Sequence, residues 1–429
     1  MTGAVLSPSL ARVRPAGSDG ASVVPRDPPR VLVVVLCAGL AFMPVLRPSL
    51  PGNSSPVDLL IGLGIALTLA WAVATNLRVH VPYVVPIGIL VAAGAIGGLA
   101  GPAKGLSLLQ LAQDVALLAW CASLVNVARS PAALGALVRT WAWSSIVWAA
   151  LLVVAYATGV DTLSGVTDRT GGRASLTFGD ANLAATYFVL SLLVVAASRT
   201  PRHRAARLGG YGLLLAAMAL TGSNGALLAL AIALPLAGAI AIRRRLGTAP
   251  AVVAVAACLV AAAVAVPRVD LGAIQEWAQA TDQPLLIDSI GRTDQSTYDR
   301  AALVDEAQDL YYSDRGLTGW GPRATKTILT MQQVPFPKEA HDDYIAALVE
   351  RGILGAVGLL VLIAAVAFRT RALFGGRDAR PFAAAIPRTV PLVAAVIAVA
   401  VFSTNEQVLH FRQIWALFAI VAAYHLWAT

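Results

Sequence analysis

The side chains best suited to chemistry lie at the end of a long polar segment, just before an apolar stretch. The chain there reads K-E-A-H-D-D-Y-I-A-A-L-V-E-R-G-I-L-G from Lys338 to Gly355. Histidine has an unperturbed pKa of about 6.5, so His341 could take a proton from a hydroxyl group at neutral pH. A helix here would put His341, Tyr344 and Leu348 on one face. By residue type alone, the favoured explanation is an interfacial His and Tyr belt that anchors the helix.

A second segment carries an arginine in a setting that could bind an anion. It reads T-G-G-R-A-S-L-T-F-G-D-A-N and runs from Thr170 to Asn182. Arg173 would lie near the positive end of the next apolar helix, which Asp180 or Asn182 would cap. The same pattern fits a capped, charged surface loop equally well.

A third segment begins at Gly291-Arg292 and continues to G-L-T-G-W-G-P, Gly316 to Pro322. The three glycines around Trp320 predict a tight turn whose N–H groups could approach an anion, although a plain loop is the commoner explanation. A further stretch, L-T-G-S-N-G-A, lies at 220–226 between two apolar segments. It is typical of a turn and offers little for chemistry.

Asp114 is the notable ionisable residue inside an apolar segment, with Gln110 and Gln113 close by. A charge in hydrocarbon is costly, so such a residue is either functional or held by hydrogen bonds inside the helix bundle. The sequence favours neither explanation.

The amino-acid composition predicts the kind of secondary structure that positions these residues. Of the 429 residues 58% are hydrophobic and 13% charged, and the mean hydropathy is +0.73. The apolar residues occur in blocks of about the length that crosses a bilayer, which predicts an all-α polytopic membrane protein. A secreted enzyme, a coiled coil and an outer-membrane barrel are excluded. Cys37, Cys121 and Cys258 lie in apolar stretches without cysteine or histidine companions, so neither disulfides nor metal ligation is indicated.

The apolar blocks predict about 12 transmembrane helices. We expect a flexible tail at 1–30, transmembrane helices one to nine within 31–267, a large and partly helical loop at 268–352, and helices ten to twelve within 353–429. The expected spans are 31–48, 57–75, 81–100, 106–126, 140–158, 181–198, 209–222, 224–242, 250–267, 353–368, 389–403 and 408–427.

The distribution of charge predicts the orientation. The tail and the connections on its side of the membrane carry far more Lys and Arg than the short connections on the other side. Basic residues near span ends stay in the cytoplasm, so both termini are expected inside and the large loop outside. The formal net charge of +9 is then a membrane-topology signal that faces anionic lipid, and it implies no nucleic acid. The arginine-rich composition favours a bacterial plasma membrane.

The motifs in this order resemble those of the O-antigen ligase and polysaccharide polymerase family. The run from Ala340 to Gly355 is similar to the family's loop histidine followed by E-x-G-I-L-G. R-A-S-L-T-F-G-D-A-N, a T-G-S-x-G-A hairpin, G-R and G-x-x-G-W-G precede it in the family's order. The layout with one large loop between spans nine and ten also matches, and implies an architecture like that of GT-C membrane glycosyltransferases.

The resemblance implies transfer of a glycan from a polyprenyl-diphosphate-linked donor to a hydroxyl of a glycan, lipid or protein acceptor. The reaction would take place outside the membrane, without a nucleotide, a metal or another cofactor. Negative charge grows on the departing lipid diphosphate, and arginine side chains can hold it. By position, His341 takes the role of the candidate base and Arg292 that of the diphosphate-binding arginine, with Arg173 as an additional anion contact.

Two positions depart from the family pattern. The hairpin usually has Ser-Arg, and here it reads Ser223-Asn224. Asn224 can donate a hydrogen bond but cannot neutralise charge, so either Arg173 or Arg323 substitutes or activity is altered or lost. Asp342 stands where Asn is common, and its carboxylate could raise the pKa of His341 and fix the ring. Tyr344 is the aromatic residue of the motif and a further candidate for substrate binding.

Two other functions stay open from the sequence. A transporter or flippase for a lipid-linked or amphiphilic substrate would use Asp114 as a proton-coupled residue, but the chain shows no inverted repeat. Asp342 and Asp343 could instead hold a divalent metal. Adjacent helical carboxylates point about 100° apart, which makes shared coordination difficult without help from elsewhere.

Overall fold

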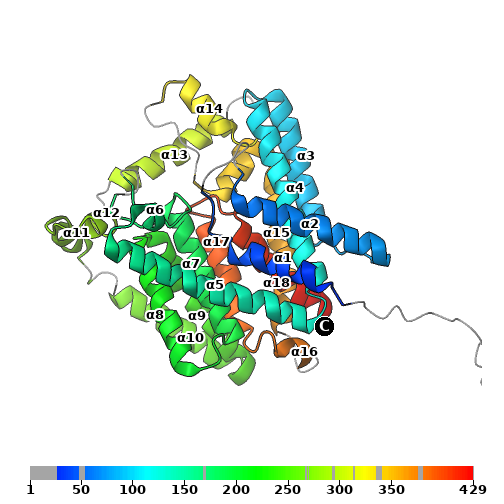
Figure 1. Ribbon diagram of the computed structural model, residues 1–429. Coiled ribbons are helices and arrows are strands. Elements are labelled where there is room, and N and C mark those ends of the chain that lie inside the picture. Colours follow the sequence, from blue (N-terminus) through cyan, green and yellow to red (C-terminus); the bar gives the residue numbers. More distant parts are fainter. Residues whose placement is uncertain are drawn as a thin grey trace, which may run out of the picture.

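The computed structural model of the protein is all helical over the residues it describes, apart from one isolated bridge between Thr167 and Gly171 (Figure 1). The described residues are 27–47, 54–167, 171–265, 268, 270–291, 295–312, 315–334, 341–374 and 380–428. The predicted tail at 1–30 lies almost wholly outside them.

Each of the predicted apolar segments contains a helix. The helices are α1 (Arg30–Ala41), α2 (Pro56–Thr75), α3 (Val84–Ala100), α4 (Lys104–Val127), α5 (Pro131–Thr158), α7 (Ala181–Ser198), α8 (Arg204–Leu220), α9 (Asn224–Leu246), α10 (Thr248–Ala265), α15 (Asp343–Thr370), α17 (Val390–Phe402) and α18 (Arg412–Trp427). Short elements, α6 (Asp161–Ser164), η3 (Arg371–Phe374) and α16 (Arg380–Ala383), lie between them. Six helices of the described chain, α2, α4, α5, α7, α9 and α15, are long and apolar enough to cross a membrane, and α1, α3, α10 and α17 are shorter apolar helices. The chain is therefore a polytopic membrane protein.

Helix boundaries differ from the prediction where polar residues start a helix. The helix α5 begins at Pro131, before the apolar run expected at 140–158, because proline suits the first helical position. The helix α15 begins at Asp343, ten residues before the expected span at 353–368, and kinks at Gly352. The connection 403–411 continues past the expected start of the last span, so α18 begins at Arg412.

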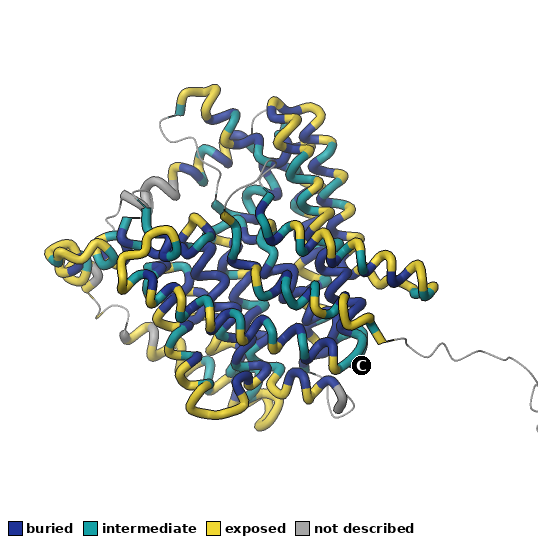
Figure 2. Tube along the Cα trace, viewed as in Figure 1, coloured by how far each residue is buried: buried dark blue, intermediate teal, exposed yellow. Residues whose placement is uncertain are grey.

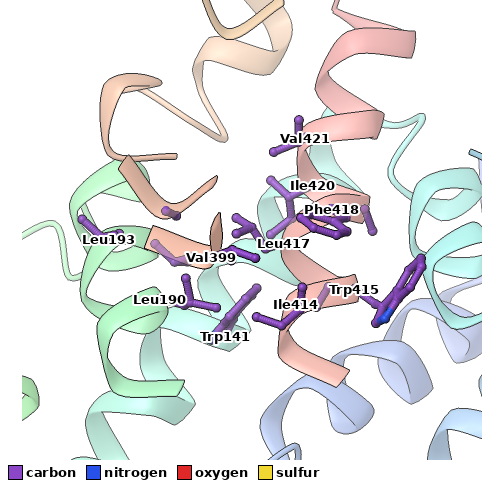
Figure 3. Close-up of a cluster of buried hydrophobic side chains, with 14 of the residues drawn as sticks. Trp141, Leu190, Leu193, Val399, Ile414, Trp415, Leu417, Phe418, Ile420 and Val421 are labelled. Carbon is purple, nitrogen blue, oxygen red and sulfur yellow. The ribbon is translucent and has the colours of Figure 1, made fainter. Parts of the chain in front are cut away.

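The helix α7 is the most buried helix of the bundle. In its most apolar window 83% of the residues are buried, against 28% to 44% in the other five candidate spans. It packs against α5, α17 and α18 (Figures 2 and 3). Trp141 Nε1 of α5 donates a hydrogen bond to Ser191 Oγ of α7 at 2.9 Å. The residues at the start of α7 are therefore held in place by a well-packed helix.

The described part of the large loop forms four helices before α15 begins. They are α11 (Leu271–Gln279), α12 (Pro284–Asp288), α13 (Gln295–Tyr312) and α14 (Ala324–Met331). Leu310 of α13, Ile328 of α14 and Val349 of α15 belong to one small hydrophobic cluster. This cluster joins the outer part of the loop to the first half of α15.

The glycine-rich turn around Trp320 binds the kink of α15. Trp320 N donates to Val349 O at 3.1 Å, and Gly321 N donates to Glu350 O at 2.8 Å. The approach is so close that a Cβ atom on Gly319 would lie 2.5 Å from Glu350 O. These N–H groups bind the protein's own carbonyl groups, so the turn is a structural clamp rather than the anion cradle that its glycines allowed.

Candidate functional site

His341 precedes α15 and is not part of it. The carboxylate of Asp342 accepts hydrogen bonds from Tyr344 N at 2.7 Å and Ile345 N at 2.9 Å, which makes Asp342 the cap of the helix. His341 has a positive φ of 46°. His341 therefore does not lie on one helical face with Tyr344 and Leu348. The sequence predicts that shared face only if the helix continues through His341.

Asp342 and Tyr344 both bind backbone groups of the protein. Desolvation raises the pKa of Asp342, and its two bonds from backbone N–H groups oppose that shift. Tyr344 donates from its hydroxyl to Ala400 O of α17 at 3.0 Å. Both residues thus hold the start of α15 in place, and their expected contact with substrate stays a prediction.

The connection 403–411 lies beside His341. Asp343 N donates to Ser403 O at 2.9 Å, and Val408 N donates to the Asp343 carboxylate at 2.9 Å. Asp342 and Asp343 thus bind different backbone groups, which does not favour a metal shared between them. The same pairing brings Glu406 to the imidazole, with Glu406 Oε2 3.2 Å from His341 Nδ1.

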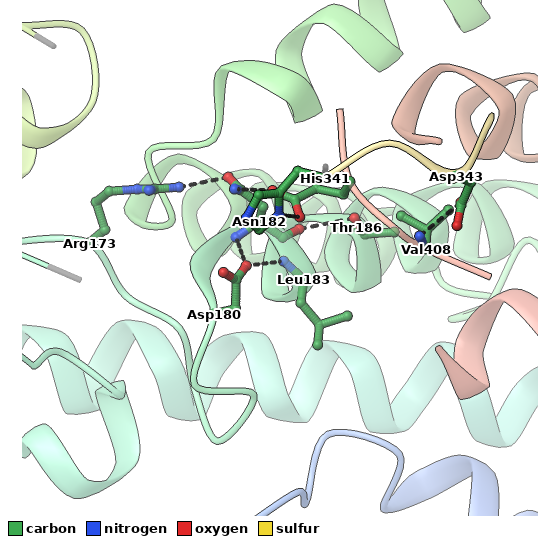
Figure 4. A network of polar contacts seen from close by, with 9 residues as sticks. Arg173, Asp180, Asn182, Leu183, Thr186, His341, Asp343 and Val408 are labelled. Carbon is green, nitrogen blue, oxygen red and sulfur yellow. Dashed lines mark hydrogen bonds and ion pairs between the residues drawn. The ribbon is translucent and has the colours of Figure 1, made fainter. Parts of the chain in front are cut away.

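Glu406 extends the contacts from His341 towards Arg173. Asn182 Nδ2 donates to Glu406 Oε1 at 2.6 Å, and Arg173 Nη2 donates to Asn182 Oδ1 at 2.8 Å (Figure 4). We call these residues, His341, Glu406, Asn182 and Arg173, the polar network. The network joins the start of α15, the connection 403–411, the start of α7 and the segment before α7.

The start of α7 is built as the sequence predicts. Asp180 is the N-cap, and its carboxylate accepts from Asn182 N at 2.7 Å and Leu183 N at 2.9 Å. The amide side chain of Asn182 is therefore fixed at its backbone by the cap and at its tip by Arg173 and Glu406. Its O and N positions follow from these two partners, one a donor and one an acceptor.

Arg173 lies against the hairpin between α8 and α9. Arg173 Nε donates to Thr221 O at 2.8 Å, and Ala174 N donates to Leu220 O at 2.9 Å. Asn224 is the exposed first residue of α9 in the same hairpin. The guanidinium of Arg173 thus supplies positive charge at the hairpin, where Asn224 supplies none.

The loop that leads to Arg292 reaches the same hairpin. Gly172 N donates to the Asp288 carboxylate at 2.8 Å, and a Cβ atom on Gly222 would lie 2.7 Å from Ser289 Cβ. Gly291 is described and Arg292 lies outside the described residues, so the position predicted for its side chain stays a prediction.

Arg323 is found at a cavity next to the connection 403–411. It precedes α14 with a positive φ of 61° and lines a cavity with Asp343 and His410. Of the two arginines expected to replace the missing hairpin charge, Arg173 is the one found at the hairpin.

Asp114 is held inside the bundle. Its carboxylate forms an ion pair with Arg351 Nη2 at 2.7 Å, and Gln110 Nε2 donates to its other oxygen at 3.1 Å. The side chains of both charged residues are largely buried. This pairing is the structural alternative that the sequence left open, and it does not favour a proton-coupled transporter.

Two residues of the network, Glu406 and Asn182, were not predicted as site residues. Asn182 stood in the sequence only as a possible helix cap. Glu406 counted only as a charge in a short connection, although an acidic residue between two apolar helices was the signal that could have singled it out.

The comparisons with known proteins bear on the segment that contains this site. No curated protein matches the chain. Residues 209–360 match the family described as O-antigen ligase. The match includes the hairpin, the large loop and His341, and it ends before Glu406. The family implies a glycosyltransferase-type enzyme that uses lipid-linked glycans. Residues 209–360 of this polytopic membrane protein thus form a segment that matches the O-antigen ligase family.

Proposed function

We propose that the protein transfers or polymerises a glycan from a polyprenyl-diphosphate donor onto an acceptor hydroxyl on the extracytoplasmic face. His341 is the base, and Arg173 together with Arg292 holds the diphosphate. The observation that carries this proposal is the polar network, which connects a candidate base to a candidate anion ligand through two fixed side chains.

The reaction needs one displacement at the anomeric carbon of the donor sugar. The acceptor oxygen forms a bond to that carbon, and the carbon–oxygen bond to the diphosphate breaks. The bonding electron pair leaves with the polyprenyl diphosphate, while the acceptor's proton moves to His341 Nε2. Arg173 and Arg292 stabilise the negative charge that grows on the leaving group.

Glu406 is a positioning residue for His341. A carboxylate beside Nδ1 favours the tautomer with a proton on Nδ1, which leaves a lone pair on Nε2 for the acceptor's proton. The same carboxylate stabilises the imidazolium that forms. The side chain of His341 is 43% exposed and that of Glu406 13%, so the open ring can reach substrate while its partner stays fixed.

Asn182 couples the two functional groups. It donates to Glu406 and accepts from Arg173, so the base and the anion ligand share one support on the buried helix α7. This arrangement supports a fixed spacing between the attacked carbon and the leaving diphosphate.

The distribution of basic residues supports an extracytoplasmic site. The hairpin, the large loop and the connection 403–411 are on the side opposite the arginine-rich connections if the chain crosses the membrane as its charges predict. Both termini would then lie in the cytoplasm, and the site would face the compartment in which lipid-linked glycans are displayed.

The test is complementation of a strain that lacks the gene. We expect His341→Ala and Arg292→Ala each to abolish long surface polysaccharide on gels while membrane abundance stays normal. Single repeats that remain attached would indicate a polymerase, and accumulation of lipid-linked polymer would indicate a ligase. Polymer of normal length and amount in both variants would overturn the proposal. Lys326→Ala, a change in the same loop outside the site, is the matched control.

A further inference from the structure

A cavity of about 70 Å³ lies beside the polar network, between α3, α4, α15, α18 and the connection 403–411. We call it the polar cavity. Its volume has room for a few water molecules, or for one edge of a small ring that replaces them. Its polar lining includes Asp114, Arg323, Asp343, Arg351, Gln407 and His410.

The charges of the polar cavity do not suit a second diphosphate. Arg351 is already paired with Asp114. Glu350 and Asp343, both buried, bring two further carboxyl groups, against the single guanidinium of Arg323. Carboxyl groups, amides and a guanidinium together are the donors and acceptors that bind hydroxyl groups of a neutral ligand. The apolar part of the lining, with Leu359 and Trp415, would cover its C–H surface.

One amide of the cavity lacks a hydrogen-bond partner among the described residues. Among the described residues, Gln407 Nε2 is buried and has no hydrogen-bond partner. Leaving a buried donor unsatisfied is unfavourable, so such a group points to water or a ligand that accepts its hydrogen bond. His410, an exposed residue that also lines the cavity, adds a second polar group.

The polar cavity and the polar network lie on two sides of the same pair of segments. Glu406 faces His341 and the next residue, Gln407, lines the cavity. Asp343, two residues after His341, lines the cavity too. Figure 4 shows Arg173 and Asp343 on opposite sides of His341.

We propose that the polar cavity binds the edge of a neutral sugar, the terminal sugar of the acceptor that carries the attacking hydroxyl. The proposal rests on the proposed function, because direct displacement places the attacking oxygen and the leaving diphosphate on opposite sides of the anomeric carbon. Arg173 lies on the side of His341 where the leaving diphosphate would bind, and the polar cavity lies on the opposite side of His341. The acceptor oxygen then loses its proton to His341 as its bond to carbon forms.

The test measures sugar binding without donor. The probes are methyl glycosides of the common neutral hexoses and deoxyhexoses, and the sample is the full chain in lipid nanodiscs, observed by ligand-detected NMR. We expect at least one glycoside to bind the wild type, and Gln407→Leu to weaken its binding about tenfold, the effect of one lost hydrogen bond. Ala346→Phe, which places a ring in the cavity, should abolish binding.

The matched control is Gln413→Leu. Gln413 is also buried with an unpartnered Nε2 among the described residues, but it does not line the polar cavity, so this variant should bind the glycoside like the wild type. Failure of every glycoside to bind the wild type would overturn the inference. Binding as tight as that of the wild type by both Gln407→Leu and Ala346→Phe would overturn it too. Glycoside binding by a protein that transfers no glycan would instead overturn the proposed function and leave the sugar site intact.

Discussion

The two sides of His341 differ in how their polar groups are satisfied. In the polar network, Glu406 and Asn182 bind protein partners, and Asn182 uses both atoms of its amide. In the polar cavity, Gln407 presents a buried amide nitrogen without a partner among the described residues. Paired groups keep neighbouring side chains in a fixed geometry, whereas an unpaired buried group gains free energy only when something binds it.

The backbone elements that carry Asn182 and Gln407 also differ in how firmly they are held. Asn182 stands at the capped start of α7, the most buried of the candidate spans. Gln407 stands in a connection without regular structure between α17 and α18. Under the proposed function, the network side would position a base and an anion, and the cavity side would receive a ligand.

Removing the charge of Glu406 should have the largest effect on catalysis. In Glu406→Gln the amide can still accept from Asn182 but would donate to His341 Nδ1. The imidazole would then carry its proton on Nε2 and could not act as a base. We expect kcat to fall by about 10²- to 10⁴-fold, the usual contribution of general base catalysis, with donor KM nearly unchanged.

Two variants separate positioning from folding. Glu406→Asp, which keeps the carboxylate, should restore most of kcat, and Asp161→Asn, at an exposed acid of α6, should behave like the wild type. Steady-state kinetics with purified protein would measure both constants. If Glu406→Gln kept the wild-type kcat, the network would be structural only.

A charge transplant at the hairpin tests the anion end of the network. Arg173→Ala should lower kcat/KM for the donor by about 10²-fold, as expected for loss of a charged group at a leaving group. Adding Asn224→Arg to this variant should recover about tenfold, because it returns a guanidinium to the same hairpin. Asn224→Gln is the control and should recover nothing. Equal rates in Arg173→Ala with and without Asn224→Arg would show that Arg173 acts through Thr221 and Asn182 rather than through charge.

The sequence could predict the helices and could name His341 and Arg173 as candidate site residues, but it could not predict their partners. Apolar runs identify helices because a spanning segment must satisfy its backbone internally, and Asp180 was predictable as a cap from local pattern. His341 and Glu406 are 65 residues apart, and Asn182 and Glu406 are 224 apart. Only the tertiary packing of α7, α15 and α17 brings them together.

At the start of α15, one polar residue changes where the helix begins and therefore whether His341 lies in a helix or in a loop. Hydropathy places the helix boundary at the onset of the apolar run near 353. The carboxylate of Asp342 moves the boundary back, because it accepts the N–H groups that begin the helix at Asp343. His341 therefore belongs to the loop, where it can meet Glu406.

The smallest expected effect concerns His410 and the acid stability of the cavity side. Desolvation lowers the pKa of His410 to about 3, and the nearby cations Arg323 and Arg412 act in the same direction; in the unfolded chain the pKa is about 6.5. Between these values the unfolded protein binds a proton that the folded protein does not. The contribution of this group is therefore complete above about pH 6.5 and is lost as the pH falls towards 3.

His410→Gln removes this dependence while it keeps a polar side chain in the cavity. We expect the Tm of the wild type to fall more than that of His410→Gln when the pH is lowered from about 7 to about 5, by thermal unfolding in one detergent. His203→Gln, at the N-cap of α8, is the comparison variant, because His203 does not line the polar cavity. The titrating carboxylates are common to all the proteins and cancel in the comparison. An identical loss of Tm in the wild type and in His410→Gln would mean that the folded protein protonates His410 as readily as the unfolded chain does, and the lowered pKa of His410 would have to be abandoned.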